Sequence, residues 1–242
     1  MDTLSRLDTQ AAAWGLRLDD DRRECLKEYS YLLASYDRAN VIGTRDVDGI
    51  LLDHVLDSLS CFLHGGLLRA RSLADVGSGG GLPGIPIKIM KPDLATMLVE
   101  STGKKARFLR YAIDRLSLDG AEVANVRVED LGRTQAHRGA YEVVTSRAVA
   151  RLSVVAEYCV PLLEIGGRAI AMKGRLDAAE LEEGARVVDA LGAKVVDVVR
   201  VPMLAEIGQK ERNLVVLEKV RETQAQYPRR PGVAARRPLG VG

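Results

Sequence analysis

From Ser72 onward, short apolar runs alternate with longer amphipathic stretches, and this alternation constrains the fold more than any other feature of the chain. The apolar runs, which predict strands, are Leu73–Val76, Ala95–Val99, Glu122–Val126, Glu142–Thr145, Arg168–Met172, Lys194–Val199 and Leu214–Leu217. The amphipathic stretches, which predict helices, are Pro83–Met90, Lys104–Leu116, Leu152–Leu163 and Ala178–Leu191. The pattern predicts an α/β fold with helices on both faces of a mostly parallel sheet. Because no helical stretch separates the last two runs, they are expected to pair antiparallel at one edge.

Two amphipathic helices are predicted ahead of this sheet. Apolar residues recur every three or four positions over Asp19–Arg38 and again over Val47–Leu63, which is the spacing of one helix face. The segment Arg38–Asp46 between them lacks this spacing and is predicted to be a loop. The expected organisation is a helical cap at residues 1–70 followed by an α/β domain at residues 71–220.

The last residues, 221–242, differ in composition from the rest of the chain. They combine three prolines and a single glutamate with five arginines, namely Arg221, Arg229, Arg230, Arg236 and Arg237. A segment with so few apolar residues and so much charge cannot bury a core, so it is predicted to be disordered. We interpret it either as a solvated tail or as an arm that contacts nucleic-acid phosphates.

Composition and charge argue against several classes of protein. Hydrophobic residues make up 47% of the 242 residues, enough to form a core. The three cysteines are widely spaced, so no metal site is predicted, and reduced thiols in a cytoplasmic protein are expected. Neither a signal peptide nor an apolar run of the roughly 18 residues that a membrane helix needs is recognisable. The net charge of +2 by itself predicts no partner.

A glycine-rich loop, "DVGSGGGLPGIP", follows the first predicted strand. Ligands of open parallel sheets bind where strands end, and glycines let a ligand approach the backbone. Gly79, Gly81 and Gly84 fit the pattern G-x-G-x-x-G, which alone is a weak indication of a nucleotide-like ligand. A phosphate-binding P-loop is excluded at Gly103–Lys105, because the preceding glycine and the following Ser or Thr are missing.

Acidic residues stand at or after the ends of three consecutive predicted strands. Asp75 precedes the loop and lies close to where a dinucleotide would place its pyrophosphate, so it favours a cationic or neutral ligand. S-adenosylmethionine is such a ligand, with a sulfonium, an ammonium and a ribose but no phosphate. Glu100 could accept both ribose hydroxyls, and Glu129 could reach the adenine amino group. Either glutamate could instead cap a helix.

Six motifs, "DVGSGGGLPGIP", "VESTGKKARFL", "VRVED", "VTSRAVA", "MKG" and "ERNLVVLEK", resemble the glucose-inhibited division protein B family over about Asn40–Lys219. Members of that family are bacterial methyltransferases that modify guanine N7 in 16S ribosomal RNA of the small subunit. The resemblance implies a Rossmann-like class I methyltransferase sheet, S-adenosylmethionine as cofactor, and 16S ribosomal RNA or the small ribosomal subunit as partner. It implies a cytoplasmic enzyme without DNA or membrane partners, and we expect a monomer.

The resemblance also implies roles for individual residues. Glu100 would hold the ribose, and Arg147 would line the site near the methyl donor or the incoming base. The residues expected at the cofactor are Asp75, Gly77, Gly79, Leu82, Glu100, Val128, Glu129 and Arg147. Asn40 and His54 would lie near the RNA, although a lone histidine among apolar residues is often simply part of a core. Departures from the family pattern are Asn213 in place of histidine and "NVIG" in place of "NLTS".

Methylation of guanine N7 requires no general base, because N7 already carries an in-plane lone pair. Catalysis should then come mostly from alignment of the reacting atoms. Arg147 offers a planar donor that could fix guanine O6 or a phosphate. Its alternative role is an ion pair with Glu100 or Glu142.

The expected RNA contacts are cations near strand ends, namely Lys104, Lys105, Lys173 and Arg175. RNA binding through such residues should weaken steeply with salt. Three alternatives stay open at this point: a small-molecule methyltransferase of the same fold, a nicotinamide-dependent dehydrogenase, and a non-catalytic ribosome-binding module. The acid before the glycine loop and the lack of a catalytic Lys/Tyr or His/Asp pattern disfavour the dehydrogenase.

Overall fold

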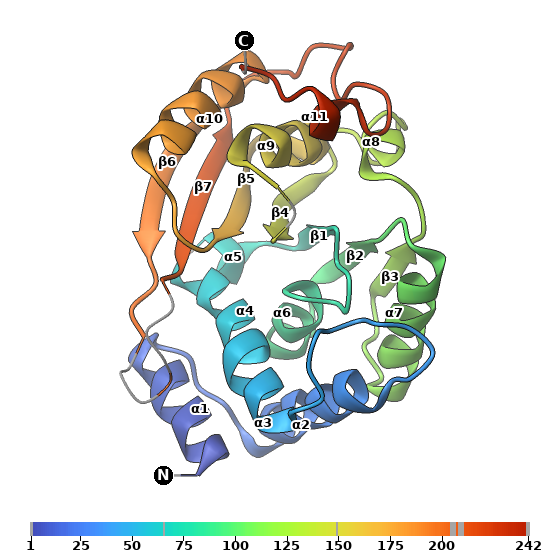
Figure 1. Ribbon diagram of the computed structural model, residues 1–242, viewed down its shortest axis with the longest axis vertical. Coiled ribbons are helices and arrows are strands. Elements are labelled where there is room, and N and C mark those ends of the chain that lie inside the picture. Colours follow the sequence, from blue (N-terminus) through green and yellow to red (C-terminus); the bar gives the residue numbers. More distant parts are fainter. Residues whose placement is uncertain (1, 65, 149, 204–206, 208–210, 241–242) are drawn as a thin grey trace.

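A computed structural model describes residues 2–64, 66–148, 150–203, 207 and 211–240 (Figure 1). Seven strands form one sheet in the order β3-β2-β1-β4-β5-β7-β6. Their bounds are β1 Ser72–Val76, β2 Ala95–Val99, β3 Ala121–Ala124, β4 Tyr141–Arg147, β5 Leu163–Lys173, β6 Ala193–Arg200 and β7 Asn213–Lys219. Strands β1 to β5 pair in parallel, whereas β7 runs antiparallel to both β5 and β6. The predicted class of fold, with its antiparallel last strand, is therefore confirmed.

Helices lie on both sides of this sheet (Figure 1). Ahead of β1 come α1 Thr3–Ala13, α2 Asp20–Ser35, α3 Val47–Ile50, the π-helical turns η1 Leu51–Leu56, α4 Asp57–Leu59, the 3₁₀ turn η2 Ser60–Leu63 and α5 Gly66–Arg69. Between the strands come α6 Gly84–Met90, α7 Gly103–Arg115, α8 Val128–Leu131, α9 Leu152–Cys159, the 3₁₀ turn η3 Val160–Leu162 and α10 Ala178–Ala190, and α11 Val233–Arg236 follows the last strand. None of the helices in the described ranges is both long and apolar enough to cross a membrane.

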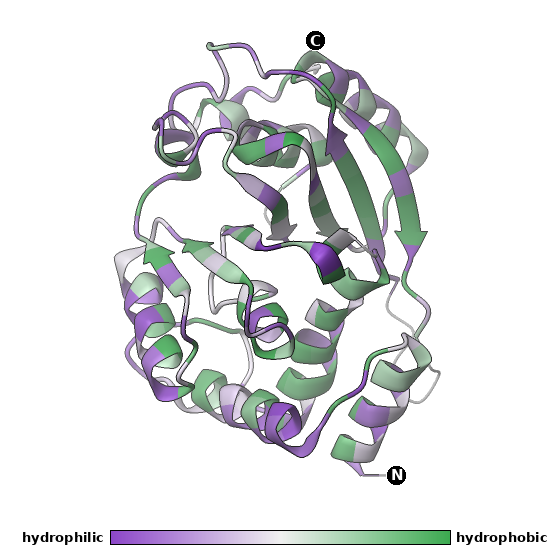
Figure 2. Ribbon diagram, turned by 180° about the vertical axis from the view of Figure 1, so that it is seen from behind, coloured by the Kyte–Doolittle hydropathy of each residue, from purple (hydrophilic) through white to green (hydrophobic). Residues whose placement is uncertain are grey.

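Two apolar cores, one on each face of the sheet, hold the layers together. Side chains alternate along β1, so Leu73 joins one core and Ala74 the other. The first core contains α1, α2, the helix of residues 47–63, α6 and α7, and the second contains α8, α9 and α10. Figure 2 shows largely apolar strands surrounded by helices that carry both polar and apolar residues. The cap thus covers one face of the sheet together with α6 and α7.

Most predicted elements are present, with bounds that differ by a few residues. The expected helices Asp19–Arg38 and Val47–Leu63 correspond to α2 and to the segment from α3 to η2. Four short or weakly patterned helices were not predicted, namely α1, α5, α8 and α11. Three of them have only four residues, too few for a helical period to show.

The segment after β7 differs from its prediction of disorder. Its described residues, 221–240, pack along α8, α9 and α10, and Ala234 and Thr223 are buried. The arginines explain this order, because Arg229 forms an ion pair with the buried Glu157 at 2.6 Å and Arg221 reaches Asp189 at 3.4 Å. Part of the arginine charge that predicted a solvated arm is therefore paired with carboxylates of the folded domain.

Candidate functional site

The glycine loop turns tightly at the carboxyl end of β1. The N–H groups of Gly77 and Ser78 both donate to the carbonyl of Val99, the last residue of β2, at 2.9 and 3.1 Å. Gly77 and Gly79 have φ values of 71° and 58°, a region that glycine occupies without strain. The Tyr29 hydroxyl of α2 donates to the carbonyl of Gly80. The cap therefore fixes the far side of the loop.

Asp75 supports this loop from beneath. Its carboxylate is fully buried and accepts hydrogen bonds from the Gly84 N–H at 3.2 Å and the Thr145 hydroxyl at 2.8 Å. Burial raises the pKa of Asp75 to about 6, against the hydrogen bonds that lower it. The expectation that this carboxylate faces the ligand does not agree with its burial. Asp75 instead joins β1, β4 and the start of α6.

Glu100 faces a cavity of about 220 Å³ at the ends of β1 and β2. Its two carboxylate oxygens accept from the N–H groups of Gly79 at 3.0 Å and Thr102 at 2.7 Å. The cavity is lined by Val76, Gly77, Val99, Glu100, Ser101, Val126, Arg127, Val128, Glu129 and Tyr158. Of the expected cofactor residues, this cavity brings together Gly77, Glu100, Val128 and Glu129. Leu82 is half-buried and packs against the first core instead.

The composition of this cavity fits S-adenosylmethionine. Each Glu100 oxygen accepts one backbone hydrogen bond and has a second lone pair, so the carboxylate can still accept from a ribose diol. Four valines supply apolar walls for a flat base. Glu129 is only 3% exposed, and its Oε1 accepts from the Gly232 N–H at 2.7 Å. That glutamate is therefore held by the C-terminal segment, a partner that its position after β3 did not indicate.

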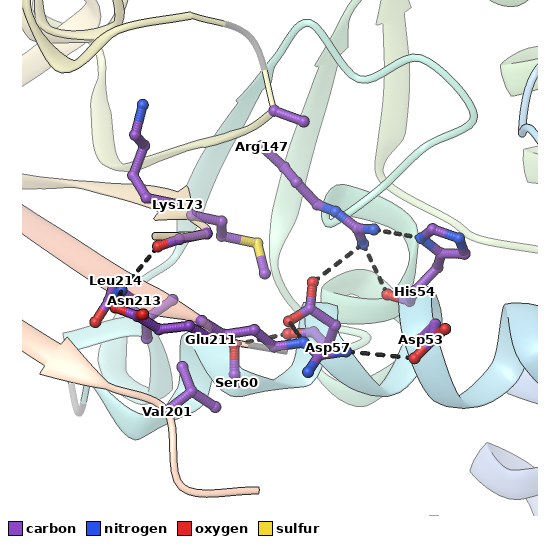
Figure 3. Close-up of a pocket in the computed structure, with 14 residues that line it drawn as sticks. Asp53, His54, Asp57, Ser60, Arg147, Lys173, Val201, Glu211, Asn213 and Leu214 are labelled. Carbon is purple, nitrogen blue, oxygen red and sulfur yellow. Dashed lines mark hydrogen bonds and ion pairs between the residues drawn. The ribbon is translucent and has the colours of Figure 1, made fainter. Parts of the chain in front are cut away.

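A second cavity, of about 230 Å³, lies between the cap and the ends of β4 and β5 (Figure 3). Arg147 reaches from the end of β4 into this cavity and donates to the His54 carbonyl at 2.9 Å. It also contacts the His54 ring and lies 3.5 Å from the Asp57 carboxylate. Glu142, one of the two partners expected for Arg147, pairs instead with Arg71 at 3.1 Å.

Asp57 is the centre of the charge network in this second cavity. Its carboxylate lies 2.9 Å from the Arg212 guanidinium and 3.5 Å from that of Arg147. Burial raises the pKa of Asp57, while Arg147 and Arg212 lower it. Arg212 also reaches Asp53 at 3.4 Å. Three carboxylate–guanidinium contacts thus tie the cap helix to β4 and to the start of β7.

The expected RNA contacts fall into two groups. Asn40, Lys104 and Arg175 are exposed and Lys105 is half-buried. Lys173 is instead bound within the protein, where its ammonium lies 2.8 Å from both Glu180 and the carbonyl of Ala150. These contacts leave the Lys173 ammonium less available to a phosphate than its place at the end of β5 indicates.

Several residues of the two cavities were not predicted from the sequence. Among them are Asp53, Arg212, Ser101, Arg127 and Tyr158. Arg212 adjoins Asn213 in the motif "ERNLVVLEK", but only the fold shows that it meets Asp57. Tyr158 lies on a helix with an apolar period and carried no sequence signal of its own.

The two cavities lie on either side of the pair formed by β1 and β4. Val76 is paired with Ser146 in the parallel register, so Gly77 and Arg147 follow at the same edge of the sheet. The first cavity opens on the β2 side of this pair and the second on the β5 side. Both cavities therefore lie at the carboxyl ends of the parallel strands, on either side of the point where the strand order reverses, which is where ligands of open α/β sheets bind.

Comparisons with known proteins identify related sequences. The model of the GidB family, rRNA small subunit methyltransferase G, matches residues 22–215. The ribosomal RNA small subunit methyltransferase G of Rubrobacter xylanophilus is 54% identical over 96% of this chain and 90% of its own length. Its counterpart from Roseiflexus sp. (strain RS-1) is 46% identical over 95% of this chain and 97% of its own length.

A solved structure, geranyl diphosphate C-methyltransferase from Streptomyces coelicolor A3(2), has a TM-score of 0.55 at 15% identity. The match covers 84% of this chain and 99% of that one, and it shows the fold alone. The family model and the family members, in contrast, align with most of the sequence. The chain belongs to the rRNA small subunit methyltransferase G family.

Proposed function

We propose that this protein transfers the methyl group of S-adenosylmethionine to N7 of one guanine in the 16S ribosomal RNA of the small subunit. The observation that carries the proposal is the Glu100 carboxylate, which faces a cavity beside the glycine loop at the sheet edge where a second cavity opens. The family's name, and the resemblance of the motifs to guanine-N7 methyltransferases, support ribosomal RNA as the substrate.

The residues have separate tasks in this reaction. S-adenosylmethionine, when bound, supplies a methyl group made electrophilic by its sulfonium. Glu100 would accept the ribose hydroxyls, and Gly77 and Val128 would border the nucleoside. Arg147 would orient the guanine from the neighbouring cavity, where the contacts of its guanidinium to His54 and Asp57 hold it in place. Because N7 carries no proton, alignment of the two reactants accounts for catalysis.

RNA would approach over a groove of about 740 Å³ between α7 and the end of α2. Arg107, Arg110 and Tyr111 line it from α7, and Arg38 lines it from the loop that leads to Asn40. Arginines bind phosphates and the exposed Tyr111 ring can stack on an unpaired base. Lys104 and Lys105 lie in the first turn of α7, a few residues after Glu100, so the cations of α7 would extend from the cofactor cavity to this groove.

We further propose a monomeric enzyme that acts in the cytoplasm on the small subunit or its 16S RNA. The free thiols of Cys25, Cys61 and Cys159 are typical of a reducing compartment.

The test uses purified protein, S-adenosylmethionine with a labelled methyl group, and small ribosomal subunits from a strain that lacks the enzyme. Naked 16S RNA and a cell extract depleted of RNA are run in parallel. Label in the 16S RNA is the expected result. Label only in small molecules would instead indicate a small-molecule methyltransferase, and cofactor binding without any transfer would indicate a ribosome-binding module.

A further inference from the structure

The C-terminal segment lies directly behind the cofactor cavity, in a place that its composition did not predict. It follows the sheet and lies beyond residues 22–215, which the family model matches. In Figure 1 it crosses from α10 past α9 toward α8, and α11 contacts α9. Both α8 and the end of α9 contribute residues to the cofactor cavity, namely Val128, Glu129 and Tyr158.

One hydrogen bond joins the segment to the wall of that cavity. The N–H of Gly232 donates to Glu129 Oε1 at 2.7 Å. Gly232 has a φ of 77°, so a glycine is needed to aim this N–H. Burial, followed by the negative charge of the neighbouring Glu129, raises the pKa of Tyr158 to about 12. Gly232 thus holds Glu129, which lines the same cavity as Tyr158.

A second set of contacts fixes the segment to the helix that carries Tyr158. Glu157 is completely buried, and it accepts from the backbone N–H and from the guanidinium of Arg229 at distances between 2.6 and 3.1 Å. Arg138 donates to the carbonyls of Tyr227 at 2.7 Å and Thr223 at 2.6 Å. The residues that lead to Gly232 are thus held at Thr223, Tyr227 and Arg229.

We propose that residues 229–236 complete the cofactor site, with Gly232 and Arg229 as positioning residues that hold Glu129 and Tyr158 in place for the adenosine end of the cofactor. This inference rests on the proposed function, since it names a further part of the same site. Because coupling between a ligand and a segment is reciprocal, cofactor binding should also stabilise the segment.

The first experiment is a pair of truncations. A chain that ends after Arg229 keeps the ion pair with Glu157 but loses the Gly232 N–H, whereas a chain that ends after Arg237 keeps both and serves as the control. The cofactor product S-adenosylhomocysteine is titrated by calorimetry into each variant and into the full chain. We expect affinity to fall about tenfold in the first truncation, the loss of one hydrogen bond to a charged group, and to stay unchanged in the control.

Steady-state kinetics separate positioning from general destabilisation. The first truncation should raise KM for S-adenosylmethionine about tenfold while kcat and KM for the ribosomal subunit stay the same. Full affinity in that truncation, or an equal loss in the control, would overturn the inference. If the full chain itself failed to bind S-adenosylhomocysteine, the proposed function would fall and this inference with it.

A measurement on the intact chain keeps the test decisive if the shorter chain does not fold. Hydrogen exchange of the full protein is followed by mass spectrometry with and without S-adenosylhomocysteine. Slower exchange is expected in residues 229–236 as well as in the glycine loop. Protection of the glycine loop alone would contradict a role for the segment.

Discussion

At the residue scale, the buried carboxylate of Asp75 makes the free energy of unfolding depend on pH. Asp75 lies under the glycine loop, and burial raises its pKa to about 6 from 3.8. The folded state therefore binds more protons than the unfolded state between these values, and the free energy of unfolding must fall as the pH rises through that window. At neutral pH, the ionised carboxylate of Asp75 therefore lowers the free energy of unfolding.

Replacement of Asp75 by Asn removes this cost and keeps the contacts. The amide oxygen can accept from Gly84, and the amide nitrogen can donate to the Thr145 hydroxyl, which rotates to accept it. Between about pH 4 and pH 7, the wild type should lose up to about 3 kcal/mol of unfolding free energy relative to Asp75→Asn. Urea denaturation across this range measures the difference. Parallel curves for the two proteins would contradict the raised pKa.

Substitution of Arg147 tests the proposed role of the second cavity in binding guanine. Arg147→Ala should lower methyl transfer on the order of a hundredfold, because the base is no longer aligned, while S-adenosylhomocysteine still binds. Single-turnover kinetics and calorimetry check the two parts separately. Wild-type turnover would remove Arg147 from the mechanism, and a parallel loss of cofactor affinity would place it in the cofactor site instead.

Residue types and their order along the chain predicted the acid at the end of β2 and its place beside the glycines. They did not predict partners that are distant in sequence. Arg147 was expected to meet Glu100 or Glu142, but the fold brings it to Asp57, which lies ninety residues earlier. Likewise, Glu129 is held by Gly232. Such contacts depend on how whole elements pack, which no local pattern contains.

At the scale of elements, close packing explains why α6 begins with a glycine. A Cβ added at Gly84 would lie 2.5 Å from Leu98 Cδ2 and 2.9 Å from the Asp75 carboxylate. The helix can therefore lie directly against β1 and β2 only without a side chain at this position.

Gly84→Ala should lower the free energy of unfolding by about 1–3 kcal/mol, the cost of overpacking a core. Gly43→Ala is the matched control, since a Cβ at Gly43 would meet nothing within 4 Å, and its effect should stay within about 0.5 kcal/mol. Chemical denaturation of both variants provides the comparison. Equal stabilities would show that the helix can move away from the sheet at no cost.

Substitutions on helix α7 test whether RNA binds in the proposed groove. In the double variant Arg107→Ala/Arg110→Ala, RNA binding should weaken, and the slope of log affinity against log salt should decrease by about 1.5, since each lost phosphate contact removes roughly 0.7–0.9. Arg186→Ala on α10 is the control, because α10 lies toward the opposite edge of the sheet. Affinity for S-adenosylhomocysteine should be unchanged in both. An unaltered salt slope would exclude this groove from the RNA interface.

Elements of ordinary length could be predicted because their apolar spacing extends over several residues. The helices of four residues could not be predicted in this way. The predicted disorder of the arginine-rich segment was wrong, because composition does not show that Arg229 pairs with the buried Glu157. The π-helical turns at Leu51–Leu56 also have no signature separate from that of an α-helix. They place Asp53 and His54 on the side of the second cavity.

At the scale of the whole molecule, three parts meet around one edge of the sheet. The cap supplies Tyr29 to the glycine loop and Asp57 to Arg147, the sheet supplies Glu100, and the C-terminal segment supplies Gly232. The cap and the segment cover opposite faces of the sheet. The two cavities are thus shaped by parts of the chain that are far apart in sequence.

The central claim, methylation of guanine N7, is tested most directly by nucleoside mass spectrometry. Small subunits from a strain that lacks the enzyme are incubated with the protein and S-adenosylmethionine, and the 16S RNA is digested and analysed, with Glu100→Gln as a low-activity control. We predict new 7-methylguanosine at a single position with the wild type and far less with the variant. A methyl group on another atom or base, or no 7-methylguanosine although cofactor binding is intact, would contradict the account.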